Sequence, residues 1–412
     1  MSSVDQGGSK ASFVAEVESL RGIAALCVAI GHTHGMTVAS HFASKNEVAG
    51  LDDFAEAWFG LRIPAHAAVV VFFVISGFVL GRSLSGVGSG GTISQYASFM
   101  WRRIWRIFPA HVVALMFIVP ASMLLLAQHS IDLSAFPFLN LLPQYHLQGT
   151  AFTQVDVRLL VKDLCLATNR YNAVTWSLTV EMLMCLWLPF LYLIAKRNML
   201  LLDFFVVVGF GVATWLWNPH YGDDFYFLLY VPAFYLGLLV ERRGMQWADR
   251  ISALFGNRDR AIAASYLAVS LAGLLNAVDS ALSQHLVALG TFGLVSLLVH
   301  ARGSRIAAIL RHPALRWNGR ISYSFYLWHW TLLVLILRLA YEKLPPAIIL
   351  SYNTVFFLVV LLVTIALALA IAHISFHCIE RPCIRFGRQV WRTLATFTLS
   401  VRRLTTSRHD VP

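Results

Sequence analysis

Charged side chains are scarce in this chain and are spread thinly along its whole length. Asp, Glu, Lys and Arg make up 13% of its 412 residues, whereas soluble globular proteins carry about 25%. Hydrophobic residues make up 58% of the sequence. So few charges cannot cover a water-facing surface of this size, which excludes a soluble globular protein and predicts an integral membrane protein.

Several sequence motifs are also absent, and each absence excludes one kind of site or segment. The five cysteines are scattered, with neither metal-ligand spacing nor the spacing of a disulfide framework. Residues 1–12 are polar and lack the basic start and the small-residue cleavage site of a signal peptide. The sequence has no G-x-S-x-G motif, which presents a catalytic serine in α/β-hydrolases. We therefore expect no bound metal and no catalytic serine presented by such a motif.

Long apolar runs take the place of the missing charge. A helix needs roughly 17 to 25 apolar residues to cross a bilayer. We find ten such runs, near residues 20–38, 66–84, 109–128, 175–195, 199–217, 224–240, 260–277, 284–301, 322–341 and 351–377. The predicted fold class is an all-α, multi-pass integral membrane protein with about ten transmembrane helices.

The positions of Lys and Arg predict the orientation. With the N-terminus in the cytoplasm, only seven of the 32 fall on the opposite side: Lys45, Arg62, Arg158, Lys162, Arg170, Arg338 and Lys343. Cytoplasmic loops carry an excess of Lys and Arg, so both the N-terminus and the C-terminus are predicted to be cytoplasmic. The net charge of +11 then lies at the level of anionic lipid headgroups. The lipid bilayer, and no nucleic acid, is the expected partner.

The first apolar run begins with an arginine and carries a histidine eleven residues later. At about 100° per residue, Arg21 and His32 return to within roughly 20° of one helical face, about 16 Å apart along the axis. His32 would then lie near the middle of the bilayer, where an ionisable side chain is expensive and is a functional candidate by default.

Two further clusters are predicted at the same depth. Glu181, in the stripe Trp176-Ser177-Leu-Thr-Val-Glu181, would lie beside His32 and make it a general base. A polar pair that only joins two helices is the alternative. His329 follows Tyr323 and Tyr326, whose hydroxyls could bind a sugar or an amide, and a histidine that only packs helices remains open.

Two candidate sites lie near the cytoplasmic surface. Arg102, Arg103 and Arg106 alternate with aromatic residues in Met100-Trp-Arg-Arg-Ile-Trp-Arg-Ile-Phe-Pro109. Guanidinium groups bind phosphate oxygens bidentately, which favours a phosphate clamp, although an interfacial anchor fits these residues equally well. Glu380 and Arg381 could supply a second carboxylate or form an interfacial ion pair.

Six segments of this sequence, taken in their order along the chain, resemble the acyltransferase-3 family. Its members are integral membrane O-acyltransferases of bacterial surface and secreted carbohydrates. The matching segments are Leu20-Arg-Gly with His32, Phe72-Phe-Val-Ile-Ser-Gly-Phe78, Trp101–Pro109, Thr175–Glu181, Ile321–His329 and Glu380-Arg-Pro382. Many relatives continue the fourth motif with a second acidic residue and an aromatic run, whereas this chain has Met182-Leu-Met-Cys185.

The resemblance implies the activity and the roles of the candidate residues. The expected function is transfer of an acyl group, in the first place acetyl, from cytoplasmic acyl-CoA to a hydroxyl of a carbohydrate or lipid-linked glycan. His32, Glu181 and His329 would be catalytic, and Trp176, Ser177, Tyr323 and Tyr326 would bind substrate. Arg21, Arg102, Arg103 and Arg106 would hold acetyl-CoA or another acyl-CoA.

The expected organisation is an acyltransferase-3-like membrane domain at 1–386 and a basic cytoplasmic tail at 387–412, in the inner membrane of a bacterium. Many relatives also carry an extracytoplasmic hydrolase-like domain; the sequence ends at Pro412, and we expect the membrane domain or a partner to complete the transfer. A proton-coupled transporter of a sugar or small anionic solute is the alternative, because midplane His and Glu also relay protons.

Overall fold

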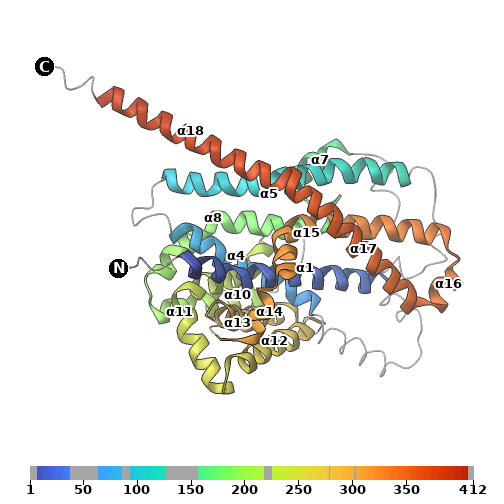
Figure 1. The fold of residues 1–412 in the computed structure, drawn as a ribbon, viewed down its shortest axis with the longest axis horizontal. Helices are drawn as coiled ribbons and strands as arrows, with labels where there is room; N and C mark the ends of the chain where they lie inside the picture. Colours follow the sequence, from blue (N-terminus) through green and yellow to red (C-terminus); the bar gives the residue numbers. More distant parts are fainter. Residues whose placement is uncertain are drawn as a thin grey trace.

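The computed structural model describes residues 7–37, 64–85, 93–126, 156–217, 225–277, 279–300 and 303–406. Every regular element in these ranges is a helix (Figure 1). The all-α fold class is thereby confirmed for the described part of the chain.

Seven helical stretches in these ranges are long and apolar enough to cross a membrane. They are Ala65–Leu84, Ser94–Ala121, Ala173–Lys196, Leu200–Trp217, Ser280–Val299, Pro313–Lys343 and Asn353–Leu394. Each coincides with one of the ten predicted runs, and the second begins well before residue 109 because the helix already starts at Ile93. The chain is therefore a multi-pass membrane protein.

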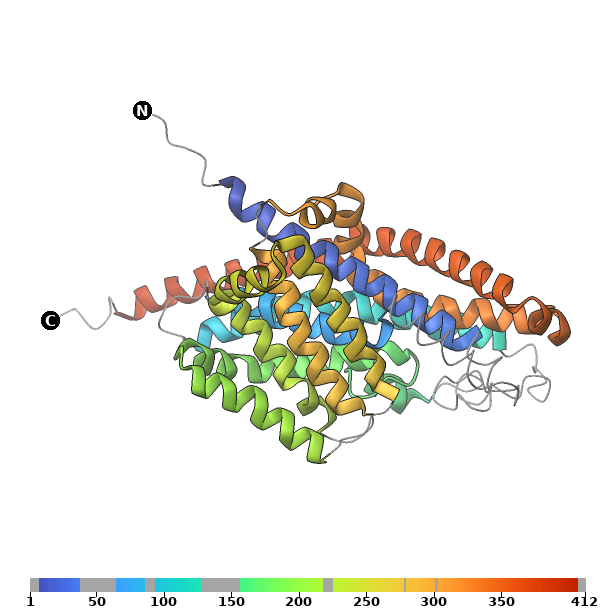
Figure 2. The same ribbon diagram turned by 90° about the horizontal axis from the view of Figure 1, so that it is seen from below.

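The other three predicted runs lie in α1 (Gly7–Thr37), α11 (Val231–Phe255) and α12 (Arg258–Leu274). Acidic and basic residues interrupt the first two helices, and α12 is 17 residues long. These helices nevertheless pack beside apolar ones: α1 against α15 (Pro313–Lys343), α11 against α4 (Ala65–Ser85) and α12 against α13 (Ser280–Val299), the last as Figure 2 shows. Ten crossings remain a prediction.

The remaining helices have these bounds: α4 Ala65–Ser85, α5 Ile93–Leu126, α7 Val157–Leu164, α8 Trp176–Lys196, α9 Leu200–Phe204, α10 Phe210–Trp217, α13 Ser280–Val299, α14 Arg305–Leu310, α15 Pro313–Lys343, α16 Pro346–Ser351, α17 Asn353–Ser375 and α18 Arg381–Thr406. Short 3-10 turns lie at Ala173–Thr175, Tyr226–Tyr230 and Leu275–Ala277. Single π-helical turns lie at Phe205–Gly209 and Phe376–Glu380.

Helix α4 lies at the centre of the bundle and packs against α1, α8, α11 and α13. Its crossing with α11 depends on two glycines. A Cβ at Gly77 would overlap the backbone of Phe234, and one at Gly237 would overlap the backbone of Val74. Small residues at helix crossings let backbones approach closely in membranes, where no hydrophobic effect drives the helices together.

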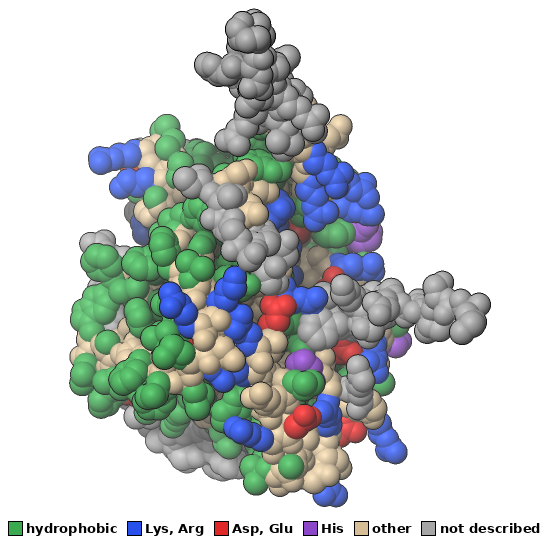
Figure 3. All heavy atoms as spheres, turned by 90° about the vertical axis from the view of Figure 1, so that its left-hand side faces the viewer, with side chains coloured by type: hydrophobic (Ala, Val, Ile, Leu, Met, Phe, Trp, Pro, Cys, Tyr) green, Lys and Arg blue, Asp and Glu red, His purple; other side chains and the backbone are tan. Residues whose placement is uncertain are grey.

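The outside of the bundle is apolar, as lipid contact requires. Large hydrophobic side chains such as Phe190 and Leu193 on α8, Leu216 on α10 and Leu362 on α17 are more than half exposed. Figure 3 views the end of the bundle at which α1 and α5 begin, and Lys and Arg side chains are spread across this face. Helix α18 runs through residue 387, and the division into a membrane domain and a basic tail at this residue stays a prediction.

The parallel packing of α1 on α15 also depends on a glycine. A Cβ at Gly319 would overlap the main-chain carbonyl of Glu18, one turn before Arg21. We expect Gly319→Ala to lower the free energy of unfolding by about 1–3 kcal/mol, the range for overpacking, and to lower the Tm in detergent. Gly35→Ala is the matched control on α1, because a Cβ there meets nothing within 4 Å. Equal Tm values for the two variants would contradict this account.

Candidate active site

Two cavities follow one another along the same helices. On α4, residues 69–80 line one cavity and residues 65–70 line the other. We call the first, of about 70 Å³, the arginine cavity, and the second, of about 880 Å³, the histidine cavity. The second volume lies within the range of ligand pockets, about 300 to 1,000 Å³. Val69 and Tyr326 line both cavities, so the two meet at these residues.

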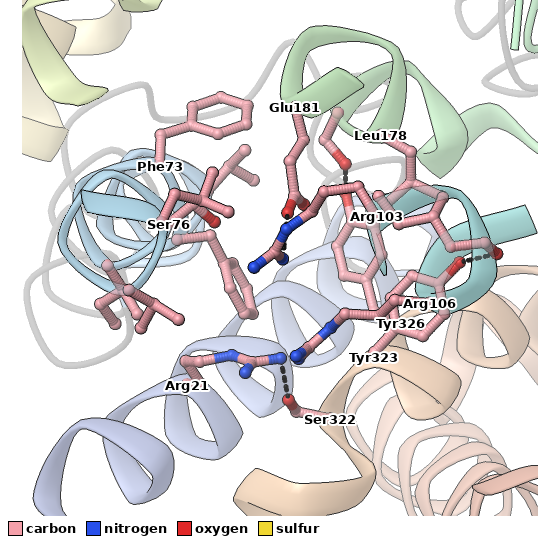
Figure 4. Close-up of a pocket in the computed structure, with 17 residues that line it drawn as sticks. Arg21, Phe73, Ser76, Arg103, Arg106, Leu178, Glu181, Ser322, Tyr323 and Tyr326 are labelled. Carbon is pink, nitrogen blue, oxygen red and sulfur yellow. Dashed lines mark hydrogen bonds and ion pairs between the residues drawn. The ribbon is translucent and has the colours of Figure 1, made fainter. Parts of the chain in front are cut away.

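The arginine cavity brings together three of the four predicted arginines. Arg21 comes from α1, and Arg103 and Arg106 come from successive turns of α5. Their guanidinium groups point toward one another (Figure 4). Such a concentration of buried positive charge fits an anion with several oxygens, such as a phosphate.

Only part of this charge is compensated by other described side chains. Arg21 Nη2 donates to the Ser322 hydroxyl at 3.3 Å, and Arg103 Nη1 lies 4.0 Å from Glu181 Oε1. Arg106 forms neither a hydrogen bond nor an ion pair with the described residues. Its donors are therefore available to a ligand.

Arg102 does not join this group. Its guanidinium donates to Ser98 Oγ, one turn earlier on α5, at 3.2 Å, and the residue does not line the arginine cavity. Adjacent residues of a helix point about 100° apart. When Arg103 faces the cavity, its neighbour faces away, so only three of the four predicted arginines meet in the arginine cavity.

One imidazole of a stacked pair lines the histidine cavity. His32 Nδ1 of α1 lies 3.0 Å from His329 Nε2 of α15, and the rings stack with centroids 5.3 Å apart. Arg21 of α1 likewise contacts Ser322 of α15. Both residues of α1 thus face α15, as their eleven-residue spacing predicts. Only His32 of the pair lines the cavity, because His329 is fully buried.

The hydrogen bonds of this pair fix which nitrogen carries a proton. His329 Nδ1 lies 2.8 Å from the main-chain carbonyl oxygen of Tyr326, which can only accept, so this nitrogen donates. In the neutral ring, His329 Nε2 is then an acceptor, and His32 Nδ1 must donate to it. The remaining nitrogen, His32 Nε2, keeps its lone pair, as a general base requires.

Glu181 does not take the place that the sequence predicts beside His32. Its carboxylate lies in the arginine cavity against Arg103, and the ring partner of His32 is His329. Similar depth on two helices does not fix which way their side chains face. Glu181 lies on the face of α8 that also carries Ser177 and Leu178, and this face lines the arginine cavity.

The rest of the histidine cavity is aromatic and polar. Its aromatic lining comes from Trp176, Tyr226, Tyr230 and Trp330. Its polar lining includes Thr168, Asn169, Asn276, Ser280, Ser283 and Gln284. Apolar walls with a few hydrogen-bonding groups are typical of sites for small organic ligands.

The sequence of residues 14–373 matches the family profile described as an acyltransferase domain, Acyl_transf_3. The chain belongs to the acyltransferase-3 family. No curated protein and no solved structure matches it. Membership makes the chain a membrane acyltransferase, which acts on an acyl donor and an acceptor in a lipid bilayer. It gives no support to the transporter alternative.

In this acyltransferase the four predicted substrate-binding residues divide between the cavities. Trp176 lines the histidine cavity, whereas Ser177 and Tyr323 line the arginine cavity. The Tyr323 hydroxyl donates to the carbonyl of Ile107 at 2.7 Å and joins α15 to α5. Tyr326 lies between the two cavities.

The predicted ion pair at the end of the last span is not formed. Glu380 is buried in the π-helical turn and accepts from the Ser324 hydroxyl at 3.0 Å, whereas Arg381 is exposed and makes no ion pair with a described residue. Sequence neighbours on a helix face different directions, which separates the two charges. Among the described residues, no group of three His, Cys, Asp or Glu could hold a metal ion.

Several residues that line or support the two cavities carry no signal that marks them in the sequence. Ser322 contacts Arg21, and residues 168–170 line the histidine cavity from a loop. The buried carboxylate of Asp163 accepts hydrogen bonds from the Thr168 hydroxyl and from the amides of Arg170 and Tyr171 at 3.0 and 2.6 Å, and so holds this loop. In the sequence, a lone Asp before a polar loop gives no sign that its carboxylate will hold that loop by hydrogen bonds.

Proposed function

We propose that this protein transfers an acyl group, in the first place acetyl, from cytoplasmic acyl-CoA to a hydroxyl of a carbohydrate or glycolipid acceptor. The observation that supports this proposal most directly is that the two cavities meet. One is lined by three arginines, and the other is lined by an imidazole with a free lone pair. An acyltransferase needs both an anion-binding donor site and a base for the acceptor.

The arginine cavity suits the donor side. Arg21, Arg103 and Arg106 would bind the phosphates of acyl-CoA, and the neutral pantetheine arm would extend toward His32. The excess of Lys and Arg in the predicted cytoplasmic segments supports an orientation in which this cavity faces the cytoplasm. The N-terminus and C-terminus would then also lie there, with ten helices crossing what would be a bacterial inner membrane.

The histidine cavity suits the acceptor side. Aromatic rings of Trp176, Tyr226 and Tyr230 offer faces for the C–H surfaces of a sugar ring. The amide of Gln284 and the hydroxyl of Ser283 offer hydrogen bonds to sugar hydroxyls. The cavity volume of about 880 Å³ leaves room for more than one sugar unit.

In the transfer step His32 Nε2 removes the proton of the acceptor hydroxyl. The hydroxyl oxygen forms a bond to the thioester carbon, and the carbon–sulfur bond of that thioester then breaks. The imidazolium of His32 returns its proton to the departing thiolate, so that an ester and free CoA are formed. His329, held by the carbonyl of Tyr326, would keep His32 in the tautomer that exposes Nε2 as the base.

The test is acceptor-dependent release of CoA by the purified protein in nanodiscs. Acetyl-CoA would be supplied with a panel of neutral and anionic glycans, free thiol measured with time, and the product identified by mass. We expect free thiol only with an acceptor, together with a product heavier by one acetyl group. Uptake of a sugar into proteoliposomes without thiol release would instead favour a transporter.

A further inference from the structure

Tyr326 is the aromatic side chain that the two cavities share. With Val69 it lines both, although the residue is only 6% exposed. A group that moves from the arginine cavity to His32 must therefore pass between a residue of α4 and a residue of α15.

The side chain of Tyr326 is held from two other helical segments. Its hydroxyl accepts a hydrogen bond from Ser177 Oγ at 3.0 Å and donates one to the carbonyl of Val174 at 3.2 Å. Phe72 of α4 meets its ring edge-to-face, with centroids 5.9 Å apart. The ring cannot swing aside without breaking two buried hydrogen bonds, each worth on the order of 1 kcal/mol or more.

The space on the two sides of this ring is very unequal. The arginine cavity measures about 70 Å³ and the histidine cavity about 880 Å³. Room for extra carbon atoms is therefore scarce on the donor side and at the boundary, and plentiful on the acceptor side. We therefore expect selection among acyl groups of different length on the arginine-cavity side and at the boundary, where the free volume is small.

We infer that Tyr326, opposite Val69, is the specificity-determining residue that restricts the donor to short acyl chains. This inference rests on the proposed function, because it needs an acyl thioester that reaches His32 from the arginine cavity through this boundary. A bound acyl chain would lie against the edge of the fixed ring, and each additional methylene would have to displace it. One methylene too many in a closely fitting apolar site lowers kcat/KM by about 10- to 200-fold.

The experiment compares kcat/KM for acetyl-, butyryl- and hexanoyl-CoA with one acceptor in nanodiscs. We expect Tyr326→Leu to raise the hexanoyl-to-acetyl ratio at least about tenfold, since leucine is smaller and cannot be tethered. Tyr326→Phe keeps the ring but removes the hydroxyl that tethers it, so its ratio should lie between those of the wild type and Tyr326→Leu. A ratio is independent of the fraction of protein that folds.

Val69→Ala opens the same boundary from α4 and gives a second, less disruptive variant. We expect it to shift the ratio in the same direction. Unchanged ratios in both Tyr326→Leu and Val69→Ala, with acyl-CoA turnover in the wild type, would overturn the inference alone. No turnover of any acyl-CoA by the wild type with any acceptor of the panel would overturn the proposed function together with it.

Discussion

Replacement of His32 by alanine is expected to lower the rate of acyl transfer by about 10²- to 10⁴-fold, the contribution typical of a positioned general base. The physical reason is the loss of Nε2, the one nitrogen of the His32–His329 pair that keeps a free lone pair. Initial rates of acceptor-dependent CoA release at saturating donor measure the effect. The Kd for acetyl-CoA should not change, because the arginine cavity is untouched.

His34→Ala is the matched control for this variant. His34 lies two residues further along α1, and its ring packs edge-on against Phe357 of α17 with centroids 5.8 Å apart. It should keep nearly the wild-type rate. A His32→Ala protein as active as the His34→Ala protein would remove His32 from the mechanism.

Replacement of Arg106 by alanine is expected to weaken binding of acetyl-CoA by about 10- to 100-fold. Hydrogen bonds to charged groups contribute about 1.5–3 kcal/mol, and each 1.4 kcal/mol is a factor of ten in Kd. Arg106 is the informative arginine because it has no hydrogen bond or ion pair within the described part of the chain. Arg103, by contrast, lies against Glu181.

Calorimetric titration in detergent measures the change in Kd for acetyl-CoA. Two controls show whether this change comes from a lost contact with phosphate. Arg320→Ala removes one exposed positive charge from α15 outside the arginine cavity and should leave the Kd unchanged. S-acetyl-pantetheine has the arm and the thioester without the nucleotide phosphates, so Arg106→Ala should scarcely alter its binding. An equal loss for both ligands would mean that Arg106 does not bind phosphate.

The sequence predicts the helices well where hydropathy is the only requirement. The seven apolar spans were found because their side chains face lipid or an apolar core. Helices α1, α11 and α12 do not meet the same limits, and in α1 the site itself is part of the reason. Arg21 and His32 lower the hydropathy of the helix that carries them, so the candidate site residues weaken the signal for the span.

Positions within the site were predictable only along the helix axis. The eleven-residue interval correctly puts Arg21 and His32 on one face, because both belong to a single rigid helix. The pairing of His32 with Glu181 required the rotation of α8 relative to α1, which no local spacing encodes. The same limit explains why Arg103 enters the arginine cavity and Arg102 does not.

The two roles of Tyr326 are carried by different parts of the residue. Its ring lies between the cavities, while its main-chain carbonyl holds His329 and, through it, the tautomer of His32. Every amino acid supplies that carbonyl. Substitutions at position 326 therefore keep the hydrogen bond that sets the tautomer, and they change only the ring, which separates the cavities and packs against His329 with centroids 5.5 Å apart.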